Sequence, residues 1–429
     1  MLMMSTMTAF GQTIAEELMA DPNRAAGNFY ALPIGKTPKD TPAPKGKKPF
    51  YINHYGCSGS YYKEMSTVYD QPYAVFAKAD SLGKLTKLGK DVKKRIEMLR
   101  NDAKDRIGEL TSKGIEQCHE QVRQIVQRFP DMFAPGSYFS GRTVVQNNCI
   151  MTAQEAMVHL SSLVRPLDIN LTASHKDARY INPQDKAVQA LCWDSLTQVR
   201  YDRFMDLNSG NARLMKSLFN DQNFLIKETD PGVLSRQLFV LAGSIQHTDL
   251  AGRTTLYDLF TPEEILSHWK KLNAKYYIMN GACTLNGGTQ PFMQSASLRN
   301  MIHMGDSAQN RMTPMAHLRF TNENVVMALA CLMELNNCGL QTDNLDSIGD
   351  LGWRSHNIAP LGGSIMMIHY RSEMGDPDML VKVLLNGEEA RLPIETDCAP
   401  YYHWDDVKRY YLRKLYRYEN IRLNEEVKK

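Results

Sequence analysis

One short stretch of the chain carries three side-chain types that can take part in nucleophilic chemistry. Cys57 and Ser58 are adjacent, and His54 lies four residues before Ser58. A serine attacks a substrate when a neighbouring base accepts its proton and a nearby group stabilises the developing charge. A cysteine reacts as a thiolate, which needs positive charge close by. The stretch therefore indicates either a nucleophilic site with such partners, or a framework histidine beside a buried, inert thiol.

The local sequence predicts the element that positions these side chains. Residues 50–54 are expected to form a buried strand, because apolar and aromatic residues dominate the segment. Gly56 and Gly59 then indicate a loop whose backbone can come close to a ligand. Alternation along the strand places residues 54, 56 and 58 on one face only for as long as the strand persists.

The same stretch resembles the signature of the histidine acid phosphatases, in the bacterial branch that is similar to the multiple inositol polyphosphate phosphatases. Bacterial members often carry Phe-Tyr-x-x-His-Tyr-Gly-Arg-His-Gly-Ser-Arg. Aligned without a gap, the chain keeps the positions Phe50, Tyr51, His54, Tyr55, Gly56, Gly59 and Ser60. The resemblance implies that Cys57 replaces one phosphate-binding arginine, Ser58 replaces the nucleophilic histidine, and Tyr61 replaces a second arginine. The scaffold of the motif is kept, and its reactive groups are expected to be lost.

Two more segments resemble landmarks of this family in the expected order. Residues 110–114 match the start of a long helix, which Thr111 or Ser112 is expected to cap. Residues 143–147 match the end of a strand, where the family has a third phosphate-binding arginine. Asn147 stands at that position, and Arg142 reaches it only after a register shift.

A fourth landmark covers residues 316–326, which resemble the strand that ends in a second phosphate-binding histidine and a proton donor. The histidine position falls on Asn322, and the donor falls on Glu323 or on Asn324, depending on the subfamily pattern. Glu323 is either a retained general acid or a carboxylate favoured by the helix dipole at the start of the next helix.

The resemblance implies an α/β fold, a three-layer sandwich of the histidine phosphatase type with a central mixed sheet. Residues 13–152 and 291–429 are expected to form this core, and residues 153–290 an inserted, mainly α-helical cap. Residues 1–12 are expected to be a remnant of a signal peptide, which indicates a periplasmic or secreted protein. Residues 381–385 and 392–393 are expected to pair as a hairpin around Asn386-Gly387.

Composition excludes several functional classes. Of the 429 residues, 43% are hydrophobic and 23% are charged, as in ordinary globular proteins. A net charge of +3 gives no field that would indicate nucleic-acid binding. No segment after the N-terminus is apolar enough to predict a membrane span. The cysteines and histidines show no spacing of metal ligands, so neither a metal nor a cofactor is expected.

Two hypotheses for the function follow. In-line displacement at a phosphate ester needs a nucleophile, dense positive charge and an acid, and the alignment offers instead Ser58, Cys57, Tyr61, Asn147 and Asn322. The first hypothesis is a catalytically impaired or inactive homologue, a pseudophosphatase. Its cleft would bind a phosphate ester, a sugar, a polyol or a protein partner, with the candidate binding residues Cys57, Tyr61, Asn147, His54 and Arg142.

The alternative hypothesis is an active phosphomonoesterase on inositol phosphates or sugar phosphates with a non-standard site. Positive charge would then have to enter the cleft from another position. Arg142, Lys63 and a lysine of the cap are the candidates, and the sequence does not choose among them.

Overall fold

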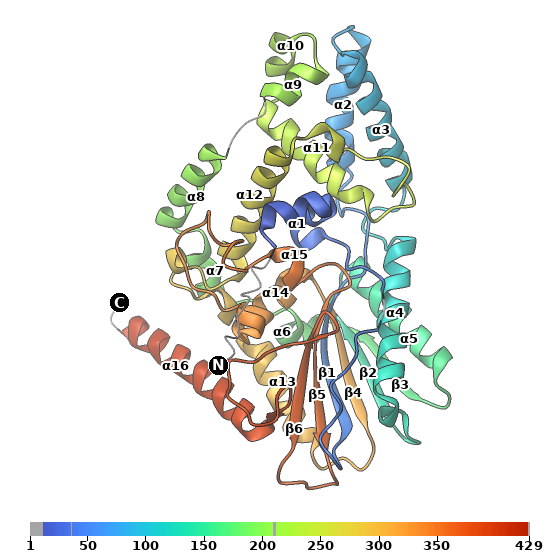
Figure 1. Cartoon of the computed structure of the whole chain (residues 1–429), viewed down its shortest axis with the longest axis vertical. Helices are drawn as coiled ribbons and strands as arrows, with labels where there is room; N and C mark the ends of the chain where they lie inside the picture. The colour runs from blue at the N-terminus through green and yellow to red at the C-terminus, as the bar shows by residue number, and fades with distance from the viewer. Residues whose placement is uncertain (1–11, 36, 209–211, 428–429) are drawn as a thin grey trace, which may run out of the picture.

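A mixed sheet lies in the lower half of the molecule in the view of Figure 1, between layers of helices. The computed structural model describes residues 12–35, 37–208 and 212–427. The strand order is β3-β2-β4-β1-β5-β6-β7, and β8 pairs with β6. The first four of these strands are parallel, and β5 to β8 add antiparallel pairs. The strands are β1 (Lys48–Cys57), β2 (Tyr138–Thr143), β3 (Asp168–Ala173), β4 (Met315–Thr321), β5 (Ser364–Arg371), β6 (Leu380–Leu385), β7 (Glu388–Glu389) and β8 (Tyr402–His403).

Helices make up the rest of the regular structure. The α-helices are α1 (Ile14–Ala20), α2 (Thr67–Ser81), α3 (Lys87–Ala103), α4 (Ser112–Arg128), α5 (Asn147–Leu163), α6 (Ala178–Ile181), α7 (Lys186–Cys192), α8 (Ser195–Leu207), α9 (Ala212–Leu218), α10 (Gln222–Glu228), α11 (Pro231–Ile245), α12 (Pro262–Asn280), α13 (Ser295–Ala308), α14 (Glu323–Leu332), α15 (Ser355–Ile358) and α16 (Trp404–Val427). The short 3-10 helices are η1 (Pro22–Phe29), η2 (Pro130–Phe133), η3 (His175–Asp177), η4 (Tyr257–Leu259), η5 (Thr284–Asn286), η6 (Gln290–Gln294) and η7 (Leu335–Asn337).

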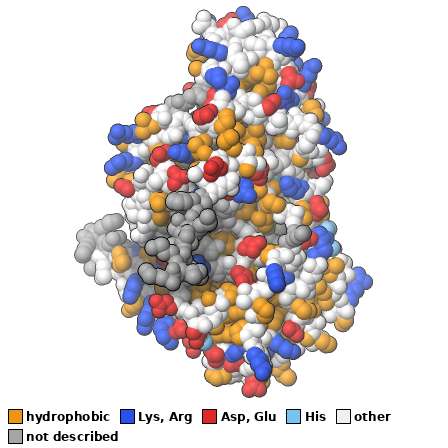
Figure 2. Space-filling model, in the orientation of Figure 1, with side chains coloured by type: hydrophobic (Ala, Val, Ile, Leu, Met, Phe, Trp, Pro, Cys, Tyr) orange, Lys and Arg blue, Asp and Glu red, His pale blue; other side chains and the backbone are white. Residues whose placement is uncertain are grey.

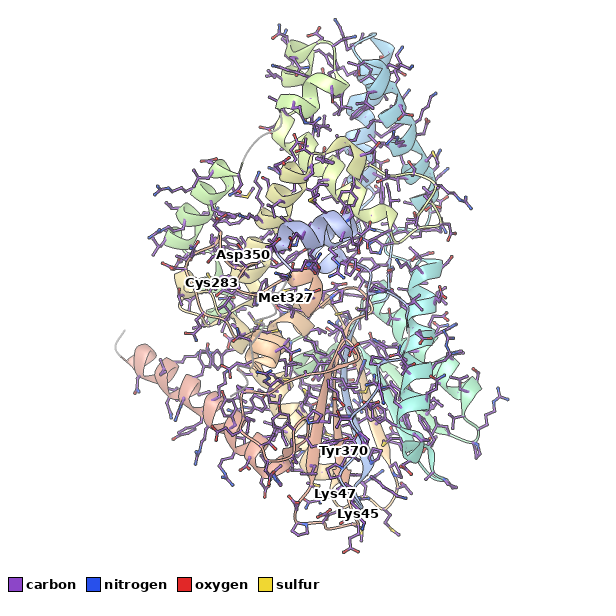
Figure 3. The ribbon with its side chains drawn as sticks, viewed as in Figure 1. Lys45, Lys47, Cys283, Met327, Asp350 and Tyr370 are labelled. Carbon is purple, nitrogen blue, oxygen red and sulfur yellow. The ribbon has the colours of Figure 1, made fainter. Side chains whose placement is uncertain are left out.

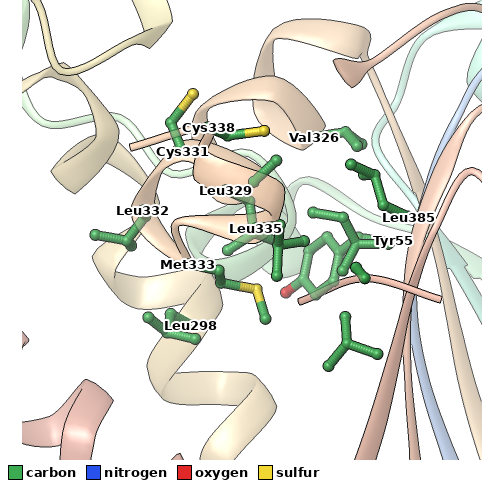
Figure 4. Packing of buried hydrophobic residues seen from close by; sticks show 14 of the residues in the cluster. Tyr55, Leu298, Val326, Leu329, Cys331, Leu332, Met333, Leu335, Cys338 and Leu385 are labelled. Carbon is green, nitrogen blue, oxygen red and sulfur yellow. The ribbon is translucent and has the colours of Figure 1, made fainter. Parts of the chain in front are cut away.

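Apolar side chains bury both faces of the sheet. On one face, Ile52 of β1 packs in a cluster with residues of α4 and α5, among them Val122 and Met157. On the other face, Tyr55 of β1 lies in a cluster with residues of α13 and α14, such as Leu298 and Leu329 (Figure 4). The sheet is therefore the middle of three layers, which confirms the expected α/β sandwich with a mixed sheet.

A separate hydrophobic cluster holds the helices in the upper part of Figure 1. It joins Phe76 of α2 and Ile96 of α3 to Leu218 of α9 and Leu238 of α11. Segments that precede β2 and segments that follow β3 therefore share one core in this region. The division into a core and a cap at residues 153–290 stays a prediction.

Two local expectations can be compared with the structure directly. Thr111 caps α4 as expected, because its Oγ1 accepts a hydrogen bond of 3.2 Å from the backbone nitrogen of Gly114. Asn386 and Gly387 form the expected turn, with φ of 54° and 87°. The prediction of the return strand is wrong, because β7 pairs with β6 and residues 392–393 do not. A two-residue turn places the next residues opposite the end of β6, which fixes that register.

The outer surface and the cysteines add three observations. Basic and acidic side chains are interspersed over the face in Figure 2. Within the described ranges, none of the helices combines the length and the hydropathy that crossing a bilayer requires. All eight cysteines lie in these ranges and are free thiols. The expected signal-peptide remnant lies outside the described residues, apart from its last position.

Candidate ligand site at the carboxyl end of the sheet

The candidate site lies where the parallel strands β1, β2 and β4 end and the next helices begin. β1 ends at Cys57, directly opposite Thr321 at the end of β4. α14 begins two residues later at Glu323, and α5 follows β2 from Asn147. Open α/β sheets bind ligands at the carboxyl ends of their strands. The topology therefore gathers the loop after β1 and the first turns of α5 and α14 in one place.

Side chains of α4 and α5 hold the backbone of the loop after β1. The backbone nitrogen of Gly59 donates to Thr152 Oγ1 at 3.1 Å, and that of Ser60 donates to Gln117 Oε1 at 2.8 Å. A Cβ atom at Gly59 would lie 2.6 Å from the carbonyl oxygen of Gly114, so only glycine fits there. The position of the loop is thus fixed before any ligand arrives.

Ser58 is fully buried, and its hydroxyl lies beside a thiol. Ser58 Oγ is 3.3 Å from Sγ of Cys149, in the first turn of α5. Burial raises the pKa of Cys149 to about 12 and raises the pKa of Cys57 well above its ordinary value. Both thiols are therefore neutral near pH 7, and Cys149 cannot accept the proton of Ser58 as a base must.

His54 packs beneath the same loop. A Cβ atom at Gly56 would lie 2.5 Å from Cε1 of His54, so the imidazole covers the glycine. Burial, together with the charge of Arg319, lowers the pKa of His54 to about 3. Neither ring nitrogen has a hydrogen-bond partner among the described residues. A neutral imidazole that packs against Gly56 and, with ring centroids 5.6 Å apart, against Phe320 is suited to supporting the strand.

A second serine of the loop does contact a histidine. Ser60 Oγ and Nδ1 of His247 are 3.0 Å apart, and both residues are buried. His247 follows α11, and its ring lies 4.4 Å from that of Phe29. Burial lowers the pKa of His247 well below its ordinary value, with a further contribution from Lys63. Its Nε2 atom has no hydrogen-bond partner within the described part of the chain.

Lys63 and Glu323 are the charged pair of the site. Glu323, the first residue of α14, is only 6% exposed, and its Oε1 lacks a hydrogen-bond partner among the residues described. Burial raises the pKa of Glu323 to about 7, and the charge of Lys63 opposes this shift. Burial lowers the pKa of Lys63 to about 7, against the opposing charges of Glu323 and Glu64. The Lys63 ammonium lies 2.9 Å from the centre of the Phe29 ring.

Two of the residues singled out from the sequence, Cys57 and Tyr61, lie around this pair. The negative charge of Glu323 raises the pKa of Cys57, Tyr61 and Cys149, in each case after the larger effect of burial. The half-buried phenol of Tyr61 also packs edge-on against Phe29, with ring centroids 5.4 Å apart. Cys57 and Tyr61 therefore belong to one neutral, mostly buried wall next to Glu323.

The other residues singled out from the sequence lie at the margin of this wall or away from it. Asn147 is exposed at the start of α5, and Asn322 caps α14 by accepting a 3.2 Å hydrogen bond from the backbone nitrogen of Val325. Arg142 donates to Asp177 Oδ1 and to the Tyr180 hydroxyl, both at 3.1 Å.

The strand register shows why Arg142 does not reach the loop after β1. A Cβ atom at Gly141 would face Met157 of α5, so Arg142, the next residue, points to the opposite face. Its neighbour across the sheet is Arg319, which pairs in turn with Tyr55. Arg142 therefore lies level with Tyr55, which is inside β1 and precedes the loop. The Arg142 side chain extends from the face of the sheet that α6 covers.

Sequence reasoning pointed to the loop and to Lys63 as a candidate source of positive charge, and it missed the contacts with Cys149 and His247. Cys149 lies two residues beyond Asn147, so extending that motif by two residues would have found it. His247 has no comparable signal, because 187 residues separate it from Ser60 and only the packing of α11 brings them together.

No known family profile and no curated protein sequence matches the chain. Solved structures do match. The multiple inositol polyphosphate phosphatase of Bifidobacterium longum, in complex with inositol hexasulfate, superposes with a TM-score of 0.76 at 14% identity, covering 90% of this chain and 97% of that one. The phytase of D. castellii gives 0.65 at 14% identity, over 92% and 85%. A Hafnia alvei phytase with tartrate gives 0.51 at 11% identity, over 86% and 98%.

These neighbours establish the fold. The protein has the fold of the histidine acid phosphatases, which the loop motif led us to expect. At 14% identity, the superposition shows that the strands and helices are arranged alike, and it does not show that the two proteins share an activity. What the site does must therefore be argued from the side chains that line it.

Proposed function

We propose that this protein is a pseudophosphatase, which keeps the cleft of the histidine acid phosphatase fold for binding and does not transfer phosphoryl groups by the family's route. One observation carries the proposal. The described side chains around Glu323 and Ser58 include neutral thiols, hydroxyls and aromatic rings, and the charges that act on Glu323 are those of Lys63 and Glu64. A cleft with this lining has lost the charge on which phosphoryl transfer depends.

The energetic argument is direct. Catalysis of this kind consists of preorganised positive charge around the transferring group, and each charge-assisted contact that is lost costs about 2–4 kcal/mol of transition-state stabilisation. Ser58 also lacks a base, since its neighbour Cys149 is a protonated thiol. Several missing contacts and a missing nucleophile together remove most of the rate enhancement that such an enzyme provides.

The lining favours a weakly charged, hydroxyl-rich ligand such as a sugar or a polyol. Lys63 and Glu323 both titrate near pH 7, so the pair carries little net charge at neutral pH. Tyr61, which is only partly buried and packs against Phe29, offers aromatic surface beside them, and aromatic faces pack well against the apolar faces of sugar rings. A phosphate monoester and a peptide are the remaining candidate ligands for the same cleft.

Export to the periplasm or the medium is part of the proposal and depends on the N-terminal sequence.

Calorimetric titration with three probes tests the proposal: inositol hexakisphosphate, myo-inositol and a panel of neutral sugars, each at low and at high salt. We expect one of the neutral probes to bind with little salt dependence, and Lys63→Met to weaken it. Lys113→Met is the matched control, because Lys113 is also shielded but donates to the carbonyl oxygen of Gln246. Tight binding of inositol hexakisphosphate that falls steeply with salt would contradict the proposal, since that behaviour requires a cationic cleft.

A specific observation supports the alternative, an active phosphomonoesterase with a relocated mechanism. Glu323 has a pKa of about 7, which suits a general acid, and Ser60 of the loop after β1 forms a serine-histidine pair with His247. The two hypotheses differ in turnover. An enzyme of this kind would release phosphate in a reaction that Ser60→Ala or Glu323→Gln abolishes.

A further inference from the structure

A second cluster of chemically capable side chains lies at the opposite end of the sheet. Asp397, Cys398 and His403 bring a carboxylate oxygen, a thiol sulfur and an imidazole nitrogen within 4.8 Å of one another. Asp378 binds the other side of the same imidazole. Carboxylate, thiolate and imidazole are the ligand types of Zn²⁺ sites.

The strand register places this cluster far from the candidate ligand site. His403 lies in β8, opposite Leu380 at the start of β6, whereas the end of β6 leads through β5 towards Gly56 beside that site. Lys47, which forms an ion pair with Asp378, is labelled at the lower end of the sheet in Figure 3. The cluster is therefore independent of the site proposed above.

The orientation of the histidine is the informative detail. Nδ1 of His403 is 2.6 Å from Asp378 Oδ1, and Nε2 is 3.0 Å from Asp397 Oδ1. Histidines that bind a metal through one nitrogen usually donate from the other nitrogen to a carboxylate, which fixes the ring. Asp378 occupies that supporting position, so Nε2 faces the side where Asp397 and Cys398 lie.

The backbone around the cluster is well anchored. Thr396 Oγ1 donates to the carbonyl oxygen of Tyr401 at 2.8 Å, which ties together the two ends of the connecting loop. Cys398 Sγ lies 3.5 Å from the same carbonyl oxygen and 3.4 Å from Thr396 Oγ1. Asp397 is exposed and His403 is partly exposed, so an ion from solvent can enter. Cys398 and His403 are therefore held in place, and the exposed side of Asp397 leaves the entry path that a functional metal site requires.

We propose that Asp397, Cys398 and His403 bind one divalent cation of the zinc type, with Asp378 as the positioning residue for His403. Ligand atoms of a tetrahedral zinc site lie roughly 3.4–3.8 Å apart, given bond lengths of about 2.1–2.3 Å. The three atoms need only small side-chain movements to reach this spacing. Binding releases the thiol proton of Cys398 and any proton on Nε2 of His403. Solvent fills the fourth ligand position.

Such an ion would join three parts of the structure. It would link the connecting loop at residues 397–398 to β8, and through Asp378 it would link both to the segment that enters β6. α16 begins at Trp404, directly after His403. The bound cation would therefore hold the start of the long C-terminal helix against the edge of the sheet.

Titration of the full chain with Co²⁺ tests the proposal, because a thiolate bound to Co²⁺ gives an intense charge-transfer absorption in the near ultraviolet. We expect one Co²⁺ per chain with this absorption, and its displacement by Zn²⁺. Cys398→Ser should abolish the absorption and weaken Zn²⁺ binding about 100-fold or more. Cys192→Ser is the matched control, because Cys192 is likewise partly exposed, and it should change neither quantity.

Two further variants give the proposal a second test. His403→Ala should weaken Zn²⁺ binding as strongly as Cys398→Ser does, and Asp378→Asn should weaken it about 10- to 100-fold while keeping the absorption. Circular dichroism of each variant establishes that it is folded. Absence of stoichiometric Co²⁺ binding would overturn the proposal, as would a charge-transfer band that persists in Cys398→Ser.

Discussion

Two buried glutamates of this protein have the same exposure and opposite environments. Glu17 in α1 and Glu323 in α14 are each 6% exposed. Glu17 forms ion pairs with Arg24, Arg354 and His356. Although burial acts in the other direction, these partners lower the pKa of Glu17 to about 2. Burial raises the pKa of Glu323 to about 7, because it outweighs the opposing effects of a backbone hydrogen bond and of the Lys63 charge.

The difference is the one expected between a charge that serves the fold and a charge at a ligand site. Buried charges that serve the fold are paired and hydrogen-bonded, as Glu17 is. A buried carboxyl left with an unpartnered oxygen costs stability, and such groups collect at sites that bind or transform a ligand. The contrast supports the placement of a ligand site at the start of α14, and it gives opposite expectations for the removal of the two charges.

The largest effect is expected for Glu17→Gln. Loss of this charge leaves Arg24 and Arg354 without their carboxylate in a shielded position. We expect the free energy of unfolding at pH 7 to fall by about 3 kcal/mol, the lower end of the range for breaking a buried ion pair. Urea denaturation followed by circular dichroism measures it. A loss below about 0.5 kcal/mol would remove the contrast on which the comparison depends.

The pH dependence of Glu17 follows from the direction of its shift. Its pKa falls from 4.5 to about 2 on folding, so its stabilisation is present above pH 4.5 and is lost as the pH falls towards 2. We expect this to contribute about 3 kcal/mol to acid destabilisation in the wild type. Glu17→Gln should therefore flatten the stability profile between pH 4.5 and 2, measured by urea denaturation at each pH.

Glu323→Gln should have the opposite sign. The pKa of Glu323 rises from 4.5 to about 7 on folding, so this residue costs no stability below pH 4.5 and its full cost appears above pH 7. We expect the variant to be more stable than wild type by about 2–3 kcal/mol at pH 8, because this pKa shift measures the net cost of the charged carboxylate in the folded state. The two proteins should unfold at the same urea concentration at pH 4. Destabilisation at pH 8 would mean that Glu323 is a structural charge.

The two serines of the loop give the smallest effects and sharpen the comparison within the site. Ser60→Ala leaves Nδ1 of the buried His247 without its hydrogen bond, which should cost about 1–2 kcal/mol. Ser58→Ala removes only a weak contact with the Cys149 thiol and should cost less than about 0.5 kcal/mol. Parallel urea titrations of both variants measure the difference. Equal costs would indicate that Ser58 has a stronger partner than a protonated thiol.

Local features of the fold could be predicted from the sequence. The cap of α4 by Thr111 was predictable because the residue preferences at a helix start depend on neighbouring residues. The aromatic strand predicted from Phe50 is β1 in the structure. The hairpin was placed at the right turn, and only its return strand was wrong. In each case, the information lies within a few residues of the element.

The chemistry of the site could be predicted only in part. The sequence singles out Cys57, Ser58, Tyr61 and Glu323 because motif positions and strand ends mark them, and the adjacent ends of β1 and β4 bring these segments to one end of the sheet. The contacts that decide what they do come from distant segments, as with His247 and Ser60, or depend on burial, as with the pKa of Glu323. Arg142 shows the opposite limit, namely a residue that is near the motif in sequence and turned away from the site in space. It directly precedes the segment 143–147, yet its side chain points to the face of the sheet away from α5.

Phosphate release by the purified, folded protein tests the central claim most directly. The substrates are phytate, a set of sugar phosphates and an aryl phosphate, each between pH 4 and pH 8. We predict no release above the rate of a protein-free blank at any pH. Turnover that disappears in Ser58→Ala, Ser60→Ala or Glu323→Gln, and persists in the Lys113→Met control, would contradict the account and establish a new catalytic arrangement on this fold.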